Sequence, residues 1–293
     1  MLTPVTKPVS RRAAIAGLAG TVGLVATACG PKSSSDARPG AASSPSGLAD
    51  VVITHIHAIA PTPQERGVLL ATHEGLFEVV GRRPRRIGPV IDLMGFTIAP
   101  SGTYLASGHP GPGSPLPDPV GLIASTDRGR TWKAQSRSGV SDFHALASTT
   151  SATLAYDNAL RVTKDGRTWF TATMPAPPRA LAASAAGTVL ATTERGLFLT
   201  YNDGQRWSPV RTPRLLVVAT WVGSSTIVGA DVDGRLVISG DAGRSWQTGA
   251  QVGAVDAICA RRTGRSVTVD YVVGTAVRRT TDLGRGTSEV FAG

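Results

Sequence analysis

Residues 51–293 alternate between short apolar runs and stretches of small or polar residues. The run Gly67-Val-Leu-Leu-Ala-Thr-His-Glu-Gly-Leu-Phe77 nearly recurs as Thr188-Val-Leu-Ala-Thr-Thr-Glu-Arg-Gly-Leu-Phe198. In both runs, two apolar segments are joined by a polar turn. Short apolar runs bounded by turn residues are typical of buried strands. The pattern therefore predicts an all-β chain made of repeated strand pairs.

A further apolar run precedes each strand pair and supplies another strand. These runs are residues 57–60, 96–99, 144–147, 179–182, 217–220 and 256–259. With an outer strand added to each, six units of about four strands cover residues 50–293.

A motif of about eight residues recurs in one turn of five of these units. Ser125-Thr-Asp-Arg-Gly-Arg-Thr-Trp132 reappears as Ser239-Gly-Asp-Ala-Gly-Arg-Ser-Trp246. The copies start at residues 125, 163, 200, 239 and 280, and four of the five tryptophans end one of them. The motif residues are Asp127, Gly129, Trp132, Asp165, Trp169, Asn202, Gly204, Trp207, Asp241, Gly243, Trp246, Asp282 and Gly284.

The residue types in this motif predict a structural role. An Asp or Asn side chain accepts hydrogen bonds from backbone N–H groups of its own turn. Glycine adopts backbone conformations that a side chain would forbid. A tryptophan that folds back beside the sheet buries a large apolar surface.

The motif resembles the Asp box, or bacterial neuraminidase repeat, of sialidases, other glycosidases and several non-enzymatic propellers. The phrases at 71–77, 106–111 and 142–146 also resemble those of actinobacterial Asp-box lipoproteins described as glycosylhydrolases or exo-alpha-sialidases. The resemblance implies a six-bladed β-propeller of four-stranded antiparallel blades, and seven blades would need shorter units. The first unit lacks the motif and carries Arg82, Arg83, Arg85 and Arg86 in the corresponding turn.

The N-terminus predicts export and lipid anchoring. Ser10-Arg-Arg-Ala-Ala-Ile15 resembles a twin-arginine export motif, and an uncharged apolar stretch from Ala13 to Ala28 follows it. This stretch is short for a membrane span and suits a signal peptide. It ends in Ala26-Thr-Ala-Cys29, which resembles a lipobox. We expect residues 1–28 to be a cleaved signal, Cys29 to carry lipid, and residues 29–49 to be a tether.

The net charge limits the classes of binding partner, and the cysteine content indicates the role of Cys259. The net charge is +10, but a protein outside the cytoplasm does not meet nucleic acid routinely. Anionic headgroups or wall polymers would attract a basic protein there, and plain solubility is the alternative. Cys259, the second of two cysteines, lies in an apolar run and is expected to be a buried small hydrophobic residue.

The histidines suggest a site. His55, His57 and His144 lie at the starts of predicted innermost strands, and His73 and His109 lie at the ends of predicted second strands. In a four-stranded blade both places open on one face, opposite the repeated turns. All five histidines should therefore gather at one mouth of the central channel. A Pro-rich insertion after His109 would form part of its rim.

Charged residues at similar positions complete the candidate ligand site. Its predicted members are His55, His57, His73, Glu74, His109, Asp142, His144, Arg179 and Asp256. Imidazoles and carboxylates also suit zinc, copper or nickel, and His57, His73 and His144 are the candidate ligands for a divalent metal. A hydrated channel entrance with neither ligand nor metal is the alternative.

The family resemblance implies cleavage of a glycosidic bond, but the expected catalytic groups are not evident. A sialidase has an Arg-Ile-Pro motif before its first box, and the nearest run here is Arg86-Ile-Gly88. Tyr156 and Tyr271 could approach the mouth without an obvious Glu partner. Other glycosidases need two facing carboxylates, for which Glu74, Asp157 and Asp231 are candidates.

We therefore expect a lipid-anchored extracytoplasmic propeller that binds a glycan or another small ligand at its His-rich mouth. A glycoside hydrolase and a scaffold for another envelope protein are the alternative functions.

Anchoring is tested at Cys29. In Cys29→Ser cells the protein should leave the membrane fraction or accumulate as the unprocessed precursor, because the new N-terminal thiol is the lipid acceptor. Cell fractionation with immunoblotting measures this, and Cys259→Ser is the matched control. A Cys29→Ser protein of mature size that stays in the membrane fraction would refute the anchor.

Overall fold

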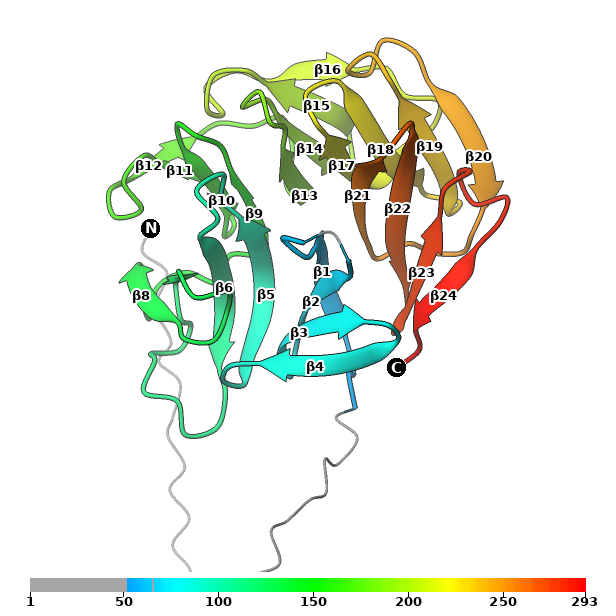
Figure 1. Ribbon diagram of the computed structural model, residues 1–293. Coiled ribbons are helices and arrows are strands. Elements are labelled where there is room, and N and C mark those ends of the chain that lie inside the picture. The colour runs from blue at the N-terminus through cyan, green and yellow to red at the C-terminus, as the bar shows by residue number, and fades with distance from the viewer. Residues whose placement is uncertain (1–51, 65) are drawn as a thin grey trace, which may run out of the picture. The chain divides into compact units, whose positions relative to one another are not determined.

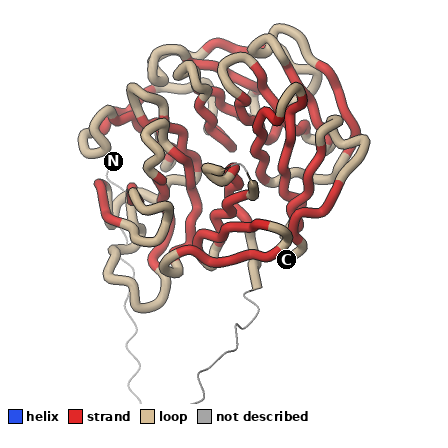
Figure 2. The backbone as a smooth tube through the Cα atoms, viewed as in Figure 1, coloured by secondary structure: helices blue, strands red, loops and turns tan. Residues whose placement is uncertain are grey.

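Each of the six predicted units folds into one four-stranded antiparallel sheet, so the six-bladed β-propeller is confirmed rather than a seven-bladed one. The computed structural model describes residues 52–64 and 66–293, in which no helix occurs (Figures 1 and 2). These residues belong to one compact unit, Asp50–Gly293. The predictions for residues 1–28 and 29–49, including Cys29, lie outside the described residues.

The blades follow the chain without exchange of strands, and strand order within each blade equals chain order. Blades 1 to 3 comprise β1 (Ile56–Pro61), β2 (Val68–Thr72), β3 (Gly75–Val80) and β4 (Arg83–Ile87); β5 (Ile91–Ile98), β6 (Tyr104–Pro110), β7 (Leu122–Ser125) and β8 (Lys133–Ser136); and β9 (Ala145–Ser148), β10 (Thr153–Tyr156), β11 (Leu160–Thr163) and β12 (Trp169–Ala172). Blades 4 to 6 comprise β13 (Pro178–Ala183), β14 (Val189–Thr193), β15 (Gly196–Thr200) and β16 (Ser208–Val210); β17 (Leu216–Val222), β18 (Thr226–Asp231), β19 (Arg235–Ser239) and β20 (Gln247–Gln251); and β21 (Ala257–Thr263), β22 (Ser266–Val273), β23 (Ala276–Thr280) and β24 (Ser288–Phe291).

The innermost strands form a ring around the axis. Each contacts the innermost strand of the next blade, and β1 contacts both β5 and β21, which closes the ring (Figure 1). Every residue of β2 and β14 is buried because each blade is covered on both faces by its neighbours. The outermost strand β8 is exposed or half-buried along its length. This arrangement explains why the inner strands appear in the sequence as continuous apolar runs.

The five repeated turns connect the third and fourth strands of blades 2 to 6. In the first of them, Asp127 Oδ1 accepts a hydrogen bond from the Thr131 backbone N–H at 2.9 Å. Ser125 Oγ donates to the same carboxylate and accepts from the Gly129 N–H, each at 2.8 Å. Asn202 accepts from the Arg206 N–H at 3.0 Å in the same way, so an amide can replace the carboxylate.

The glycine of the turn is required by the neighbouring blade. Gly129 has a φ of 85°, and a Cβ there would lie 2.4 Å from Cδ2 of Leu76 in blade 1. Gly243 has a φ of 90°, and its Cβ would lie 2.6 Å from Cγ1 of Val210 in blade 4. A side chain would therefore strain the backbone and also push the turn away from the preceding blade.

The tryptophans that end four of the turns also pack against the preceding blade. Trp132 joins the cluster between blades 1 and 2, Trp207 the cluster between blades 3 and 4, and Trp246 the cluster between blades 4 and 5. Trp169 stacks on Phe143 with ring centroids 5.1 Å apart, and its Nε1 donates to Ser136 Oγ at 2.9 Å. The motif is thus both a turn and an inter-blade contact.

Blade 1 differs because it has no such turn. Its third and fourth strands are joined at Gly81 and Arg82, both with positive φ, and Arg83, Arg85 and Arg86 lie on β4 rather than in the turn. The prediction that all four arginines occupy the turn is wrong for Arg83, Arg85 and Arg86. The chain turns at Gly81 and Arg82, and β4 begins directly afterwards at Arg83. Arg85 pairs with Glu78 at 2.6 Å.

The seam between blades 6 and 1 is filled differently. Phe77 and Phe291 join its apolar cluster. On the same face of blade 6, the buried Asp270 carboxylate binds Arg261 and also accepts from Arg279 Nε at 2.6 Å. A fully buried carboxylate needs such partners, since removing one leaves an uncompensated charge. An ion-pair network thus lies in the seam that no repeated turn spans, since blade 1 has no such turn.

Removal of one tryptophan tests the inter-blade contact. Trp132→Ala should lower the free energy of unfolding by roughly 3 kcal/mol, at the lower end of the usual loss for a large aromatic residue because the ring is partly exposed. Tyr201→Ala is the control, since Tyr201 lies in a repeated turn but is 68% exposed. It should change stability by less than about 0.5 kcal/mol. Chemical denaturation measures both, and equal losses would contradict the packing role.

The acid range tests the turn carboxylates. Hydrogen bonds from the Thr131 side chain and backbone, and then from Ser125, lower the pKa of Asp127 from 3.8 to about 2. Because the folded-state pKa lies below the unfolded value, this carboxylate stabilises the fold above about pH 4, and the stabilisation is lost as the pH falls toward 2.

The difference in melting temperature between wild type and Asp127→Asn should therefore shrink between pH 4 and pH 2. Asn202→Asp should acquire the same pH dependence, because its turn has the same geometry. A difference that does not vary with pH would show that the charge of Asp127 contributes nothing.

Candidate functional site

Irregular residues near the start of the innermost strands mark one end of the channel. The pairing of first and second strands is interrupted at His57, Met94, Arg179 and Val217 in blades 1, 2, 4 and 5. His144 and Asp256 directly precede β9 and β21, and their backbone N–H groups still bond to the second strands. Such bulges redirect a side chain. These six equivalent residues define what we call the mouth ring.

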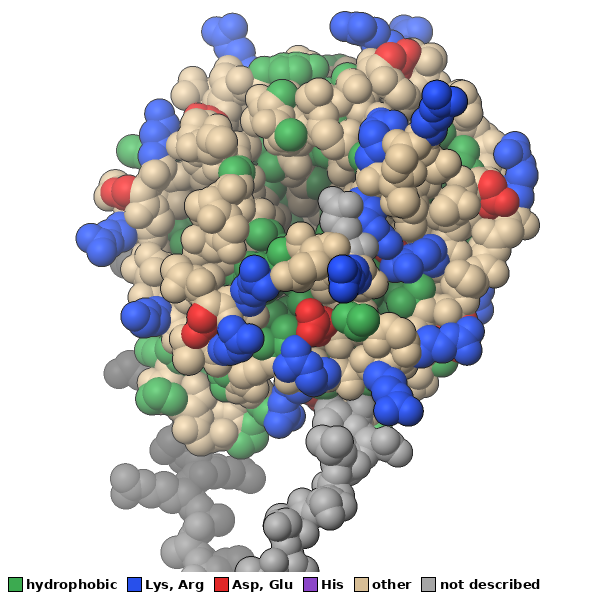
Figure 3. Space-filling view, viewed as in Figure 1, with side chains coloured by type: hydrophobic (Ala, Val, Ile, Leu, Met, Phe, Trp, Pro, Cys, Tyr) green, Lys and Arg blue, Asp and Glu red, His purple; other side chains and the backbone are tan. Residues whose placement is uncertain are grey.

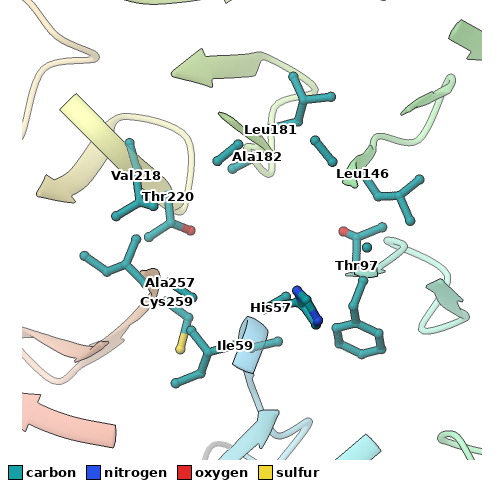
Figure 4. A pocket seen from close by; sticks show the side chains of 18 of the residues that line it. His57, Ile59, Thr97, Leu146, Leu181, Ala182, Val218, Thr220, Ala257 and Cys259 are labelled. Atoms are coloured by element: carbon teal, nitrogen blue, oxygen red, sulfur yellow. The ribbon is translucent and has the colours of Figure 1, made fainter. Parts of the chain in front are cut away.

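The mouth ring opens into a cavity of about 750 Å³ on the propeller axis. The innermost strands of all six blades line it, and Figure 4 shows their side chains around an open centre. Ile59, Leu146, Leu181 and Val218 make much of the wall apolar. His55, His57, His144, Arg179 and Asp256 also line it. The channel therefore combines apolar side chains along its wall with polar groups, which include the imidazole and charged groups at one end.

Three histidines of blade 1 form the first cluster at this end. The ring centroids of His55 and His57 are 4.5 Å apart, those of His57 and His73 are 4.6 Å apart, and those of His55 and His73 are 5.4 Å apart. His73 follows β2 directly, and β2 pairs with β1, which carries His57. The pairing explains why residues 16 positions apart in the chain become neighbours.

Asp92 of blade 2 completes this first cluster. Its Oδ2 lies 2.9 Å from His73 Nδ1, and its Oδ1 lies 3.5 Å from His57 Nε2. Asp92 was missed by sequence reasoning because blade 2 was expected to begin at residue 96, whereas β5 begins at Ile91. An acid within the apolar run Ile91-Asp-Leu93 was the available signal.

A second cluster lies between blades 2 and 3. His109 Nδ1 is 2.6 Å from Asp118 Oδ1, and His109 Nε2 is 3.3 Å from Asp142 Oδ2. His144 Nε2 approaches the same Asp142 oxygen at 2.7 Å. The insertion after β6 supplies Asp118, so the Pro-rich loop contributes a charged group to this end of the propeller.

The pKa values of two histidines, one in each cluster, shift in opposite directions. Burial, and then the nearby charge of His55, lowers the pKa of His57 to about 4. The hydrogen bond to Asp118 raises the pKa of His109 above its usual value of 6.5. At neutral pH, His57 is therefore a neutral imidazole with a lone pair, whereas His109 binds its proton more tightly.

The remaining predicted site residues flank the mouth or lie apart from it. Arg179 is exposed on β13, and Asp256 Oδ2 accepts a hydrogen bond from the Gly274 N–H at 3.0 Å. Glu74 binds the Thr54 backbone N–H and hydroxyl, the latter at 2.5 Å. His55, His57 and His144 thus line one end of the channel together with Arg179 and Asp256. His73 lies beside His57, and His109 is joined to His144 through Asp142.

The three candidate catalytic carboxylates are each engaged in local contacts. Glu74 binds Thr54 in blade 1, Asp157 pairs with Arg161 at 2.6 Å after β10, and Asp231 accepts from the Arg235 N–H at 2.9 Å in blade 5. They come from three different blades, and the contacts among the described residues join none of them to another. Each of these three carboxylates is therefore bound to a local partner, and none of them contacts another directly.

The metal-ligand geometry differs from the predicted set. Among the described residues, His57, His73 and Asp92 each offer one ligand atom, and these atoms all lie within 4.8 Å of one another. His144, the third residue of the predicted set, contacts Asp142 instead. In the structure, the third member of the candidate ligand set is therefore Asp92 and not His144.

Comparison with known proteins identifies the fold class. Among solved structures, the chain resembles YCF48 bound to D1 peptide, with a TM-score of 0.51, 13% identity and coverage of 82% of this chain and 83% of that one. It also resembles a chain of the nidogen/laminin complex, with a TM-score of 0.57, 12% identity and coverage of 75% and 91%. At these identities the likeness defines a β-propeller and nothing finer. No protein-family model and no curated relative matches the chain.

The surface charge and the search for membrane-spanning helices do not indicate a second candidate site. Lys and Arg side chains are spread over the face shown in Figure 3 rather than gathered into one patch. In the part of the chain that the structure describes, no helix is long and apolar enough to cross a bilayer. The channel end with its two histidine clusters is therefore the strongest candidate site.

Proposed function

We propose that this protein is a lipid-anchored extracytoplasmic binding propeller that takes a small ligand into its axial channel through the mouth ring. The observation that carries the proposal is the 750 Å³ channel, which has apolar side chains along its wall and imidazole and charged groups from four blades at one end. This volume lies within the usual range of small-molecule sites, which combine apolar walls with a few convergent polar groups. The tether at residues 29–49 would hold the propeller near the membrane.

The ligand matches the two parts of the channel. Ile59, Leu146 and Leu181 favour an apolar group inside, and Arg179 with the histidines favours a polar or anionic head at the mouth. A glycan terminus with an apolar substituent has this character, as does another small amphiphile. The resemblance of the turns to Asp boxes supports such a role, because Asp-box propellers include glycan-processing proteins.

A peptide end is the second candidate ligand. Two of the similar structures are recorded with a peptide or a protein, YCF48 with D1 peptide and nidogen with laminin. A chain terminus also joins apolar side chains to a charged group, so it suits the same channel. With this ligand the protein would act as a scaffold for another envelope protein. Hydrolysis is not part of the proposal, since the contacts of the three candidate carboxylates are with local partners and none of them defines a catalytic pair.

Channel binding is tested with two variants and one control. A panel of monosaccharides, including sialic acid, and short peptides is screened by thermal shift with chelator-treated protein, and hits are measured by calorimetry. Arg179→Ala should weaken binding by roughly 10-fold or more, the usual effect of losing a charge-assisted hydrogen bond. Arg82→Ala removes an exposed arginine of blade 1 and should leave affinity unchanged.

Ala182→Phe tests the channel itself. Ala182 lines the cavity (Figure 4), so a phenylalanine there should fill the space and abolish binding. Because Ala182 also packs against the cluster between blades 4 and 5, circular dichroism and a thermal melt establish that the variant is folded. A hit that binds the Ala182→Phe and Arg179→Ala variants as tightly as wild type would place the ligand elsewhere and refute the proposal. Turnover of a fluorogenic sialoside would restore the hydrolase alternative.

A further inference from the structure

Two buried polar atoms of the first cluster face each other without a hydrogen bond. His57 Nε2 and Asp92 Oδ1 are 3.5 Å apart, and neither has a hydrogen-bond partner among the described residues. Buried polar atoms are nearly always satisfied, and leaving one without a partner costs about 1–3 kcal/mol. Something that binds a nitrogen lone pair and a carboxylate oxygen together would satisfy both.

A metal ion fits the spacing of these atoms. Zinc binds imidazole nitrogen and carboxylate oxygen at about 2.0–2.2 Å, so two such ligands in a tetrahedral site lie about 3.4 Å apart. The observed 3.5 Å agrees with this separation. A hydrogen-bonded pair would be closer, at roughly 2.7–3.2 Å.

The third donor comes from His73. Its ring nitrogen belongs to the group whose ligand atoms all lie within 4.8 Å of one another. The three donors come from two blades and are fixed by backbone pairing, since the bulge at His57 lies in the β1–β2 ladder and Asp92 lies on β5. Two imidazoles and one carboxylate suit zinc, copper or nickel better than magnesium or calcium, which prefer oxygen ligands alone.

The geometry points to a divalent transition-metal site formed by His57, His73 and Asp92 at the mouth of the channel. Zinc serves as the probe ion, because its ligand distances account for the spacing of His57 Nε2 and Asp92 Oδ1. Three protein ligands leave a fourth tetrahedral position open for water or for an atom of the ligand. His57 lines the channel, so the open position lies beside the space that the ligand occupies. The role of the ion as an anchor for the ligand head group rests on the proposed function, whereas the metal site itself does not.

The alternative position for the metal is the second cluster, and its histidines supply the matched control. His144 and His73 are both exposed and each contacts one carboxylate, so replacing either one with alanine removes an imidazole with little loss of packing. Only His73 belongs to the proposed site. Asp92→Asn removes the charge of the shared carboxylate with almost no change in shape.

The experiment measures metal binding by the full-length chain, purified through a tag without histidine and stripped with a chelator. Zinc is titrated by calorimetry with a competing chelator, and bound metal is counted by mass spectrometry after dialysis. We expect one zinc per chain for wild type and for His144→Ala. For His73→Ala and Asp92→Asn the affinity should fall by more than the roughly 10–100-fold that loss of an outer-shell partner costs.

Cobalt substitution adds an independent readout, since a tetrahedral site gives intense visible absorption that the two variants should lose. Circular dichroism and thermal melts without metal establish that each variant is folded. The inference is overturned if folded wild type binds no stoichiometric zinc, if His73→Ala and Asp92→Asn bind it as wild type does, or if only His144→Ala loses it.

These titrations contain no organic ligand, and the channel screen on chelator-treated protein is repeated on zinc-loaded protein, so each result stands by itself. Zinc binding without any channel ligand would leave the metal site and remove the proposed function. A channel ligand without zinc binding would support the proposed function and refute the metal site.

Discussion

The contact between each repeated turn and the preceding blade is the interaction on which the propeller depends. A four-stranded blade cannot bury both of its faces alone, so neighbouring blades must stay at a fixed distance around the axis. The turn glycines set this distance, because Gly129 and Gly243 lie where a Cβ would collide with Leu76 and Val210. The tryptophans then fill the space beside the turn. Hydrogen bonds to Asp127 and its counterparts hold the turn in the shape that allows both contacts.

The seam between blades 6 and 1 shows what happens where this contact is absent. Blade 1 has no repeated turn and offers no tryptophan to blade 6. Phe77 and Phe291 join the apolar cluster there, and Asp270 holds Arg261 and Arg279 on the face of blade 6 that meets blade 1. Since the blades share no strand, side chains alone close the ring. The inner strands then surround a channel whose polar end is assembled from several blades.

The candidate site was partly accessible to sequence reasoning. The positions of His57, His73 and His144 within a repeated unit were enough to assign them to one end of the channel, because strand polarity follows from the order of strands. The carboxylates that pair with these histidines could not be predicted from the sequence. Asp92 reaches His57 and His73 across a blade boundary, and Asp142 joins His109 to His144 through space rather than through the repeat. The bulge at His57 also left no sequence signal, although it decides where that imidazole points.

The sequence by itself determined the propeller class, the strand order, the face that carries the turns and the end of the channel near which the histidines lie, and it favoured six blades over seven. It could do so because the period of the repeat and the alternation of strand direction are local properties that each unit repeats. Only the tertiary structure decided which charged groups meet. Asp92 contacts two histidines, and Glu74, Asp157 and Asp231 each bind a local partner. Those outcomes depend on distances of a few ångströms between separate blades. Such distances are set by packing across the inter-blade seams and by strand bulges, neither of which is encoded in the spacing of residues along the chain.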